Sequence, residues 1–523
     1  MKPSIFNDVI GPVMRGPSSS HTAAAHRIGA IIRQVCLPEI GKVLVQFDRR
    51  GSLATTYEGQ GSAMGLISGL LGLSILDPSI VRFKELAKER GLDIRFLVTD
   101  YEAKHPNTYK IRVENENMEF HFVAVSTGGG MIKINNFNGF DVAICGDYYE
   151  TLVYCESQSE SNIQNLFQLL KNQTIHSEID LYQKGDQNYL VNIKSRESLS
   201  GKVNTLLSGF TDVKWIRHMD PVMPILSGVS KPLPFGSVNE MMDLAERNGM
   251  DMAELATLYE SERAGIDSQK VISLMRDIVL TIKNSIREGL NGTSYDDRIL
   301  SQQSHLIREA EKTNRVFQTP MNTVIAYVTA LMEVKSSMGI IVAAPTAGSS
   351  GLLGGAIFGA AEGFTDDIDR ITKALLAAGL IGVFIADKYT FAAEEGGCQV
   401  ECGAASGMAA AGLVQLIGGT ARQAVNASSM ALQNILGLVC DPVADRVEVP
   451  CLGKNIMGAS NALNSANMSI AGFDPVIPLD EVIDAMKSVG DSMPSSLCCT
   501  GCGGLSVTPT AIKLHKKLSS TRN

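Results

Sequence analysis

The sequence predicts a multidomain protein with an α+β N-terminal region, a small α+β middle domain and an all-α C-terminal region. Its 523 residues are too many for one compact core, because single cores rarely grow beyond about 250–300 residues. Alternating apolar and polar residues dominate the first part of the chain, whereas residues after 236 are patterned at helical spacing. A hydrophobic content of 45% and a charged content of 19% are typical of a globular protein.

The first region, residues 1–144, mixes helix and strand. Apolar residues recur every three to four positions in 21–35 ("HTAAAHRIGAIIRQV"), which predicts a helix. Alternating patterns predict strands at 42–48, 93–99, 108–114, 119–126 and 131–139.

A second domain is predicted over residues 145–222. Its segments suggest strand, helix, hairpin, helix and strand, and the hairpin turns at Gly185–Asp186. This βαββαβ order is that of a ferredoxin-like domain. Its size and order resemble an ACT domain, a small regulatory module that often binds amino acids, but the order does not say which one.

The third region, residues 236–515, is expected to be mainly helical. Ser237 and Glu240 have the spacing of a capping box at a helix start. Apolar residues three to four apart in 271–286 predict a helix, with Gly289 and Gly292 as stop signals.

Two very apolar stretches, 338–361 and 373–392, are interrupted by polar or chain-breaking residues. A membrane span needs about 20 predominantly apolar residues, so we expect buried helices rich in Gly and Ala and no membrane partner. The net charge of −9 and the lack of a basic stripe argue against a nucleic-acid partner.

The start of the chain lacks the basic-then-apolar pattern of a signal peptide, so we expect a cytoplasmic protein. Seven of the ten cysteines lie in the last quarter of the chain. In that compartment, clustered thiols are expected to be metal-binding, catalytic or simply buried, and not a disulfide framework.

Residues 16–22 ("GPSSSHT") place hydroxyls, an imidazole and free backbone N–H groups at a predicted helix start. Such a place suits an anion, although a single Ser would already suffice as an ordinary helix cap.

Residues 344–351 ("APTAGSSG") form a second polar stretch between apolar segments. Pro345 and the glycines break the chain, and Thr346, Ser349 and Ser350 could bind a carboxylate or phosphate together with loop amides. The Lys of a nucleotide P-loop is missing. A glycine-rich packing turn is the alternative interpretation.

Cys398, Cys440 and Cys451 are 42 and 11 residues apart, which is no zinc-finger spacing. Each adjoins a chain-breaking Gly or Pro, or an Asp-Pro pair. Loops with free amides are where iron–sulfur ligands tend to lie, because N–H groups stabilise the sulfurs. Spacing alone leaves ordinary buried thiols as an alternative.

Taken together, these stretches resemble the iron–sulfur L-serine dehydratases (L-serine ammonia-lyases) over nearly the whole chain. "GPSSSHT", "HPNT" at His105–Thr108 and "STGGGMIKI" are similar to the family's beta domain, here residues 1–144. "APTAGSSG", "EEGGCQVECGAASG" and "CDPVADRVEVPCLGKNIMGAS" are similar to its alpha, catalytic domain, here residues 236–515.

The resemblance implies that Cys398, Cys440 and Cys451 hold a [4Fe-4S] cluster whose fourth iron acts as a Lewis acid. It implies conversion of L-serine to pyruvate and ammonia without pyridoxal phosphate, by a homodimer. Cys402 is expected to pack behind Cys398.

The resemblance also implies the other site residues. His21 is the expected base and His105 the second candidate. Lys454 is also expected to be catalytic and to bind a carboxylate. It stands where the family usually has Arg and keeps the charge but not the two-pronged grip, which puts the exact substrate in doubt. The expected substrate-binding residues are Ser18, Ser19, Ser20, Thr22, Asn107, Thr346, Ala347, Gly348, Ser349 and Asn455. Cys498, Cys499 and Cys502 are expected to be partly buried bystanders; they are the candidates if a fourth cysteine approaches the cluster.

Three alternatives stay open at this point. L-cysteine desulfidase would use the same cluster with sulfide as the leaving group. A non-catalytic amino-acid or redox sensor would bind its ligand in residues 145–222. A zinc site on the same cysteines is a further option.

Overall fold

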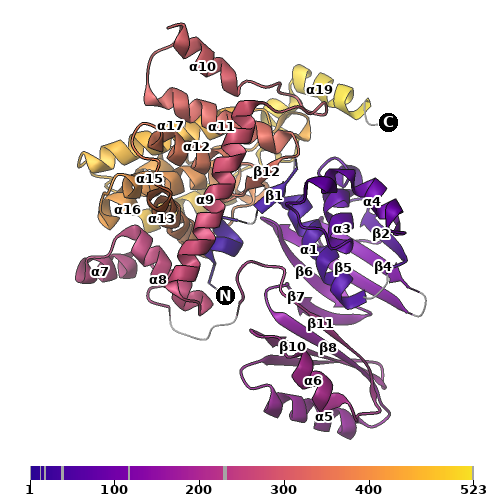
Figure 1. The fold of residues 1–523 in the computed structure, drawn as a ribbon. Coiled ribbons are helices and arrows are strands. Elements are labelled where there is room, and N and C mark those ends of the chain that lie inside the picture. Colours follow the sequence, from indigo (N-terminus) through magenta and orange to yellow (C-terminus); the bar gives the residue numbers. More distant parts are fainter. Residues whose placement is uncertain are drawn as a thin grey trace. The chain divides into compact units, whose positions relative to one another are not determined.

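In a computed structural model the chain forms two compact units. The α/β unit is His21–Gly228, and the helical unit combines Met1–Ser20 with Val229–Asn523. The predicted combination of a mixed α/β part with a helical C-terminal region is confirmed (Figure 1), whereas the domain boundaries 1–144, 145–222 and 236–515 stay predictions. The structure describes residues 2–11, 13–16, 19–36, 40–115, 118–227 and 233–520.

The first part of the α/β unit is a six-stranded sheet in the order β3-β2-β4-β5-β6-β7. Strands β2 and β3 are parallel, and the other neighbours are antiparallel. Helices α1, α3 and α4 lie over this sheet (Figure 1), and the strands predicted from alternation are all present. The elements are α1 (Ser19–Cys36), β2 (Lys42–Asp48), α2 (Leu53–Thr56), α3 (Ser62–Leu70), α4 (Phe83–Glu89), β3 (Asp93–Thr99), β4 (Thr108–Glu114), β5 (Glu119–Gly128), β6 (Met131–Phe137) and β7 (Phe140–Ile144).

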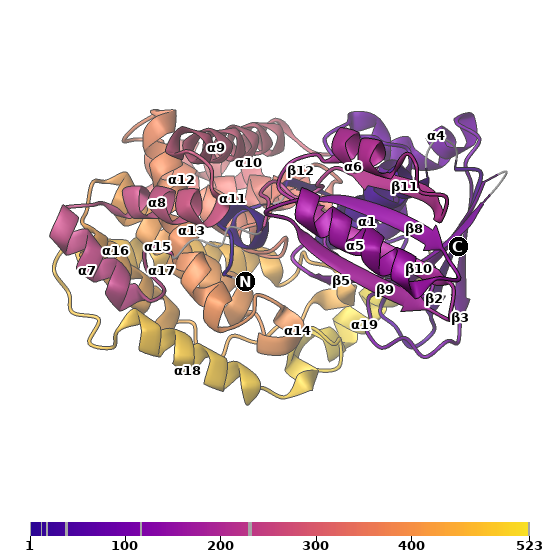
Figure 2. The same ribbon diagram turned by 90° about the horizontal axis from the view of Figure 1, so that it is seen from below.

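The second part of the α/β unit is a four-stranded antiparallel sheet in the order β11-β8-β10-β9. Helices α5 and α6 cover one face (Figures 1 and 2). The second helix of the predicted strand–helix–hairpin–helix–strand order, expected in "SRESLSGKVNTLLSG" (195–209), begins only at Ser200, because β10 continues to Ser195, which pairs with Tyr149. The elements are β8 (Tyr149–Glu156), α5 (Glu160–Gln173), β9 (Glu178–Lys184), β10 (Asn188–Ser195), α6 (Ser200–Leu207) and β11 (Val213–Met219).

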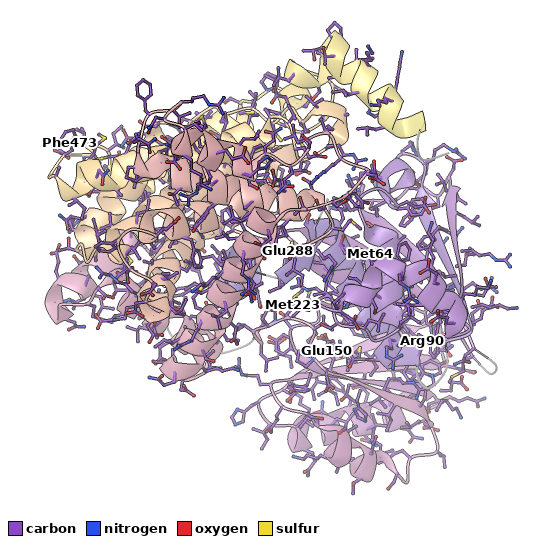
Figure 3. The ribbon with its side chains drawn as sticks, turned by 45° about the horizontal axis from the view of Figure 1, so that its top comes forward. Met64, Arg90, Glu150, Met223, Glu288 and Phe473 are labelled. Atoms are coloured by element: carbon purple, nitrogen blue, oxygen red, sulfur yellow. The ribbon has the colours of Figure 1, made fainter. Side chains whose placement is uncertain are left out.

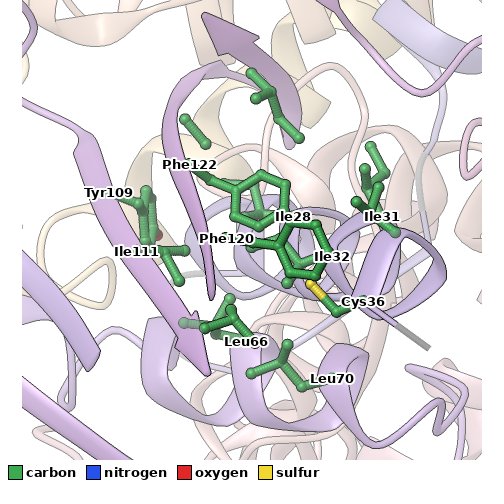
Figure 4. Close-up of a cluster of buried hydrophobic side chains, with 14 of the residues drawn as sticks. Ile28, Ile31, Ile32, Cys36, Leu66, Leu70, Tyr109, Ile111, Phe120 and Phe122 are labelled. Atoms are coloured by element: carbon green, nitrogen blue, oxygen red, sulfur yellow. The ribbon is translucent and has the colours of Figure 1, made fainter. Parts of the chain in front are cut away.

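One hydrophobic core joins both sheets of this unit. Phe120 and Phe122 of β5 lie beside Ile28 and Ile32 of α1 (Figure 4), and each such buried side chain contributes roughly 1.5–3 kcal/mol. Met223, which follows β11, joins the same core (Figure 3).

Close packing of α3 on α1 fixes the beginning of α1. A Cβ atom built on Gly65 would lie 2.2 Å from the carbonyl oxygen of Thr22, and one on Gly69 would lie 2.1 Å from that of His26. Only glycine allows this approach, so α3 holds the turn of α1 that carries His21.

The helical unit is built from α7 to α19 with two short strands. Among its contacts, α18 packs against α13, α14 and α16 (Figure 2). The elements are β1 (Val13–Arg15), α7 (Val238–Asn248), α8 (Met252–Ala264), α9 (Ser268–Asn291), α10 (Ser304–Lys312), α11 (Pro320–Ser336), β12 (Ile340–Val342), α12 (Ser350–Ala361), α13 (Ile368–Lys388), α14 (Ala393–Gly396), α15 (Ala404–Leu416), α16 (Ala421–Gln433), α17 (Cys451–Ile470), α18 (Leu479–Asp491) and α19 (Pro509–Ser520).

The beginning of the chain is built into the helical unit. Strand β1 pairs antiparallel with β12, so that Val13 lies opposite Val342. Ser4 Oγ and the Ile5 N–H both donate to the Glu260 carboxylate, each at 2.7 Å. Because Glu260 is fully buried, this segment satisfies a carboxylate that would otherwise be costly to bury.

Two sequence signals acted differently from the prediction. The Ser237 Oγ accepts the Glu240 N–H at 3.2 Å, but the Glu240 carboxylate accepts from Gly236, so only half of the capping box forms. Helix α9 continues through Gly289, where a Cβ atom would lie 2.3 Å from the Ala330 oxygen. This glycine permits helix packing and is no stop signal.

The two apolar stretches form β12 with α12, and α13 with the residues after it. Of the helices in the described part of the chain, none has the length and apolar character that crossing a membrane requires.

Candidate active site

Three chain segments of the helical unit converge on the predicted cysteines. Cys398 directly precedes a π-helical turn (Gln399–Gly403) that leads into α15, and Cys451 is the first residue of α17. The residues 344–349 connect β12 to α12. Free N–H groups and the positive end of the helix dipole favour anionic groups at such helix starts.

The three cysteines predicted as ligands are buried, with 3%, 5% and 8% exposure for Cys398, Cys440 and Cys451. The Cys398 thiol interacts electrostatically with both others. The Gln399 N–H donates to the Leu438 oxygen at 3.0 Å, which holds the segment of Cys398 beside that of Cys440. Burial raises the pKa of the Cys451 thiol to about 12.

Asn455 joins the 344–349 loop to α17. Its Nδ2 donates to the Gly348 and Cys451 carbonyl oxygens, each at 2.8 Å, and lies 3.7 Å from the Cys402 sulfur. Asn455 is fully buried, yet within the described residues its Oδ1 has no hydrogen-bond partner. The structure therefore brings together Gly348, Asn455 and Cys451, and it leaves one buried acceptor free for a ligand.

The hydroxyls of the same loop contact a carboxylate that the sequence analysis missed. Thr346 Oγ1 donates to Glu401 Oε1 at 2.7 Å, while Ser349 Oγ donates to the Ala344 oxygen at 3.1 Å within its own loop. Burial raises the pKa of Glu401 to about 7, against the opposing effect of the Thr346 hydrogen bond. Buried Ala347 completes the loop.

Two ammonium groups accompany these acids. Lys454 Nζ donates at 2.7 Å to both Asp441 Oδ1 and the Val439 oxygen, so the predicted carboxylate-binding lysine is already ion-paired. Lys335 is fully buried and donates to the Val447 oxygen. Burial lowers the pKa of Lys335, while the nearby Cys451 and Glu448 act to raise it.

These residues fit an iron–sulfur cluster. Three buried thiols, two adjacent ammonium groups and helix starts suit an anionic cluster bound through thiolates. Among the residues that the structure describes, no three His, Cys, Asp or Glu side chains are arranged to hold one metal ion. That finding concerns single ions, whose ligands lie within about 2.0–2.3 Å of one point; in a cluster each thiolate meets its own iron.

The predicted histidines belong to the α/β unit. The His21 ring hydrogen-bonds with the Asn107 side chain, to which Ser52 also donates. Removal from water lowers the pKa of His21 to about 4, against the opposing effect of Asn107. The His105 Nδ1 accepts the Asn107 N–H at 3.1 Å. His21, His105 and Asn107 are thus gathered around one loop.

The remaining residues of the "GPSSSHT" stretch are placed only in part. Thr22 is fully buried and donates to the Gln60 oxygen at 3.3 Å, and Ser20 is partly exposed. The predictions for Ser18 and for the side chain of Ser19 lie outside the described residues.

The sequence analysis missed Glu401, Lys335 and Asp441. A signal was present for the first two, because each is a charged residue inside an apolar run, in "GGCQVECGAASG" and "ALMEVKSSMG". Charges in such runs are rarely buried without a partner or a function.

Comparison with known proteins gives the same picture. A family model described as serine dehydratase alpha chain matches residues 247–506. The probable L-serine dehydratase alpha chain of Bacillus subtilis is 35% identical over 285 residues, which cover 54% of this chain and 95% of the relative. The probable beta chain from the same organism is 43% identical over 150 residues, 29% of this chain and 67% of the relative.

A single-chain relative spans both parts. L-serine dehydratase 1 of Escherichia coli is 27% identical over 511 residues, which cover 94% of this chain and 96% of the relative. The chain thus has counterparts of both the alpha and the beta chains, and it belongs to the L-serine dehydratase family.

Proposed function

We propose that the chain is an L-serine ammonia-lyase that converts L-serine to pyruvate and ammonia. The proposal rests on the way the 344–349 loop and the start of α17 come together in the helical unit. The Asn455 side chain donates hydrogen bonds to the carbonyl oxygens of Gly348 in that loop and of Cys451. The end-to-end similarity to L-serine dehydratase 1 supports the same activity.

Cys398, Cys440 and Cys451 would hold a [4Fe-4S] cluster, and pyridoxal phosphate has no part in this scheme. When bound, the cluster supplies Lewis acidity that stabilises the departing hydroxyl oxygen, as metals do for poor leaving groups. The resemblance to the family implies this cofactor, and the three buried thiols fit it.

The substrate would be bound by groups of both signs. The loop amides of Ala347 and Gly348 suit a carboxylate, while the Thr346 hydroxyl donates to Glu401 and accepts from the Ser349 N–H. The Asp441 ion pair would hold the Lys454 ammonium beside Cys440. The Glu401 carboxylate is suited to the substrate's ammonium group, because a charge-assisted hydrogen bond is strong where water is excluded.

His21 would remove the α-proton. Its lowered pKa keeps the imidazole neutral at physiological pH, which a base requires. The Nδ1 of His105 already accepts a hydrogen bond, which places the proton of a neutral ring on Nε2 and favours His21. We expect His21→Ala to lower kcat by at least about 100-fold and His105→Ala to lower it far less.

The test of this function is anaerobic purification of the wild type and Cys440→Ala, with Cys502→Ala as the exposed-cysteine control. We expect Cys440→Ala to lose both the brown colour and turnover, and Cys502→Ala to keep both. The visible spectrum is recorded with and without L-serine. Turnover that survives loss of the cluster would contradict the mechanism.

Substrate comparison separates the desulfidase alternative. Pyruvate release is measured under anaerobic conditions with L-serine, L-cysteine and L-threonine, and we expect the largest kcat/KM for L-serine. A preference for L-cysteine would replace the proposed reaction. Ligand binding without release of pyruvate from any of the three would favour the sensor.

We also propose that residues 145–222 form a ferredoxin-like, ACT-like regulatory domain that binds an amino acid. Its sheet order, β11-β8-β10-β9, is support. A pocket of about 520 Å³ lies where its sheet meets the turn between β6 and β7. Aromatic Tyr154 and Trp215 line it together with Lys184, a combination suited to a zwitterion with an apolar part.

Trp215 makes this regulatory proposal testable, because it is the only tryptophan of the chain. We expect saturable fluorescence changes on titration with one of the common L-amino acids, L-serine first, and loss of the response in Lys184→Ala. A flat titration with all of them would contradict the proposal. A cytoplasmic homodimer is proposed as well, and light scattering of the purified protein tests the dimer.

A further inference from the structure

We propose that Cys440 and Cys499 form a reversible disulfide when the cluster-free protein meets a two-electron oxidant such as hydrogen peroxide. All ten cysteines are free thiols in the structure. The disulfide goes beyond the lyase activity, and only its effect on the cluster rests on the proposed function.

The backbone places Cys499 next to Cys440. The Cys440 N–H donates to the Leu497 oxygen and the Cys499 N–H donates to the Cys440 oxygen, both at 2.8 Å. These two bonds form an isolated parallel bridge in which Cys440 is paired with Cys498, and Cys499 is the next residue. Bridge partners lie about 4.8 Å apart, and the direct hydrogen bond from its own N–H keeps Cys499 near the range of roughly 4.4–6.8 Å that the Cα atoms of a disulfide need.

The two thiols also interact electrostatically, whereas the thiol of the bridge partner Cys498 donates to the Pro494 oxygen at 3.6 Å. Cys499 has a φ of 60°, the left-handed region that a Cys rarely adopts. Such a conformation persists only where the surroundings enforce it. Here the Leu505 N–H donates to Asp441 at 2.9 Å and Ser506 donates to the Pro442 oxygen at 2.8 Å, which fixes the two segments together.

Exposure determines which thiol is oxidised first. Cys499 is partly exposed, whereas Cys440 is 5% exposed. Peroxide would oxidise the Cys499 sulfur to a sulfenic acid, and its O–O bond breaks with release of one water. The Cys440 sulfur then attacks, the S–O bond breaks, and the oxygen leaves as a second water with the thiol proton.

Two other cysteines serve as internal comparisons. Cys402 also interacts electrostatically with Cys398, but both are almost fully buried and lie four residues apart at one helix start, out of reach of the oxidant. Cys502 is exposed, and its Sγ donates to the Thr500 oxygen at 3.3 Å. If exposure alone decided the oxidation, Cys502 would react. If the fixed neighbourhood of two thiols decides it, Cys499 reacts.

The disulfide would remove one proposed ligand from the cluster site. Cys440 cannot bind iron while it is bonded to Cys499. The oxidised protein would therefore not bind a new cluster until a thiol reductant had reduced the disulfide. Meanwhile the disulfide would protect Cys440 from irreversible oxidation.

The experiment uses full-length cluster-free protein treated with about equimolar hydrogen peroxide, then alkylated and digested without reduction. We expect one linked peptide pair containing Cys440 and Cys499, and two of the ten thiols lost to alkylation. Dithiothreitol should restore both. Cys499→Ser should abolish the linked pair, while Cys502→Ser should leave it unchanged.

Reconstitution with iron and sulfide is the second measurement, followed by the visible absorbance of the cluster. We expect little absorbance from oxidised wild type, recovery after reduction, and full absorbance from peroxide-treated Cys499→Ser. A linkage of Cys499 to Cys498 or Cys502, or a Cys440 that stays fully alkylated, would overturn the proposal. Peptide mapping does not depend on catalysis, so it tests the disulfide even if the protein proves not to be a lyase.

Discussion

Glu401 in the helical unit and Glu150 in the α/β unit are both buried carboxylic acids, and burial raises the pKa of each to about 7. Their surroundings differ. Glu401 accepts from Thr346 and interacts with the charges of Lys335 and Lys454. Glu150, on β8 (Figure 3), accepts from Asn192 at 2.8 Å in the middle of a sheet.

A raised pKa of a buried carboxylic acid does not by itself identify an active site. A functional carboxylate is recognised when thiols, ammonium groups and a polar loop surround it. Glu150 interacts with the charge of Lys194 and with the Cys145 thiol, but its hydrogen bond comes from Asn192 on the neighbouring strand and not from a polar loop. Within the described residues its Oε1 and the Asn192 Oδ1 have no partners. It is a candidate for a stability effect, not for catalysis.

The largest expected effect separates the two acids by activity. Glu401→Gln should lower kcat/KM for L-serine by at least about 100-fold, because the amide keeps the shape but loses the charge proposed to bind the ammonium group. Glu150→Gln, the matched control, should stay within about two-fold. Anaerobic steady-state kinetics with cluster absorbance measured in parallel decide this, and equal losses in both variants would erase the distinction.

The second effect concerns stability and pH at Glu150. Its folded pKa of about 7 exceeds the ordinary value of 4.5, so the folded state binds the proton more tightly. The stability from this group is therefore complete below about pH 4.5 and is lost as the pH rises through 7, by about 3 kcal/mol in total. Lys194 acts to lower the pKa, and Asp147 and Asp180 to raise it.

Urea unfolding of wild type and Glu150→Gln at pH 5.5 and 8.5 measures this effect. Trp215 is a suitable probe, because β11 pairs with β8 in the same sheet. We expect the free energy of unfolding of Glu150→Gln, relative to that of wild type, to be larger at pH 8.5 than at pH 5.5. A difference between the proteins that does not change with pH would contradict the burial of an ionisable Glu150.

The smallest expected effect comes from removing the partner of each acid. Thr346→Val deletes the hydroxyl that donates to Glu401 and should raise KM about 10-fold, since such a bond contributes about 1–1.5 kcal/mol. Thr346→Ser keeps the hydroxyl and should behave like wild type. Asn192→Leu should instead lower the free energy of unfolding by about 1–2 kcal/mol and leave KM unchanged.

Much of the α/β unit could be predicted, because its strands alternate between a buried and an exposed face. The strands predicted at 42–48, 93–99 and 108–114 have the observed bounds. The helix start at Ser200 could not, because it depends on the pairing of β10 with β8. The prediction that Gly289 ends its helix was wrong for a similar reason, since this glycine packs against the backbone of Ala330 in α11.

The site could be predicted only where motifs carried it. The resemblance pointed to Cys398, Cys440 and Cys451, and the structure places the Cys398 thiol in electrostatic reach of the other two; their role as ligands stays a proposal. The prediction did not include Glu401, whose importance depends on the Thr346 contact across 55 residues. It treated Cys499 as a bystander, whereas the Cys499 N–H donates to the Cys440 oxygen. Such contacts depend on long-range folding that no local pattern encodes.

The pairing of β1 with β12 makes the helical unit discontinuous along the chain. A fragment starting at residue 233 would leave Glu260 buried without its contacts to Ser4 and Ile5, and β12 without its neighbour just before the 344–349 loop. Anyone who dissects the protein should therefore supply residues 2–20 as a peptide or fuse them back by circular permutation. During synthesis, β1 must wait for a partner encoded more than 300 residues later, so the helical unit closes only after β12 has been made.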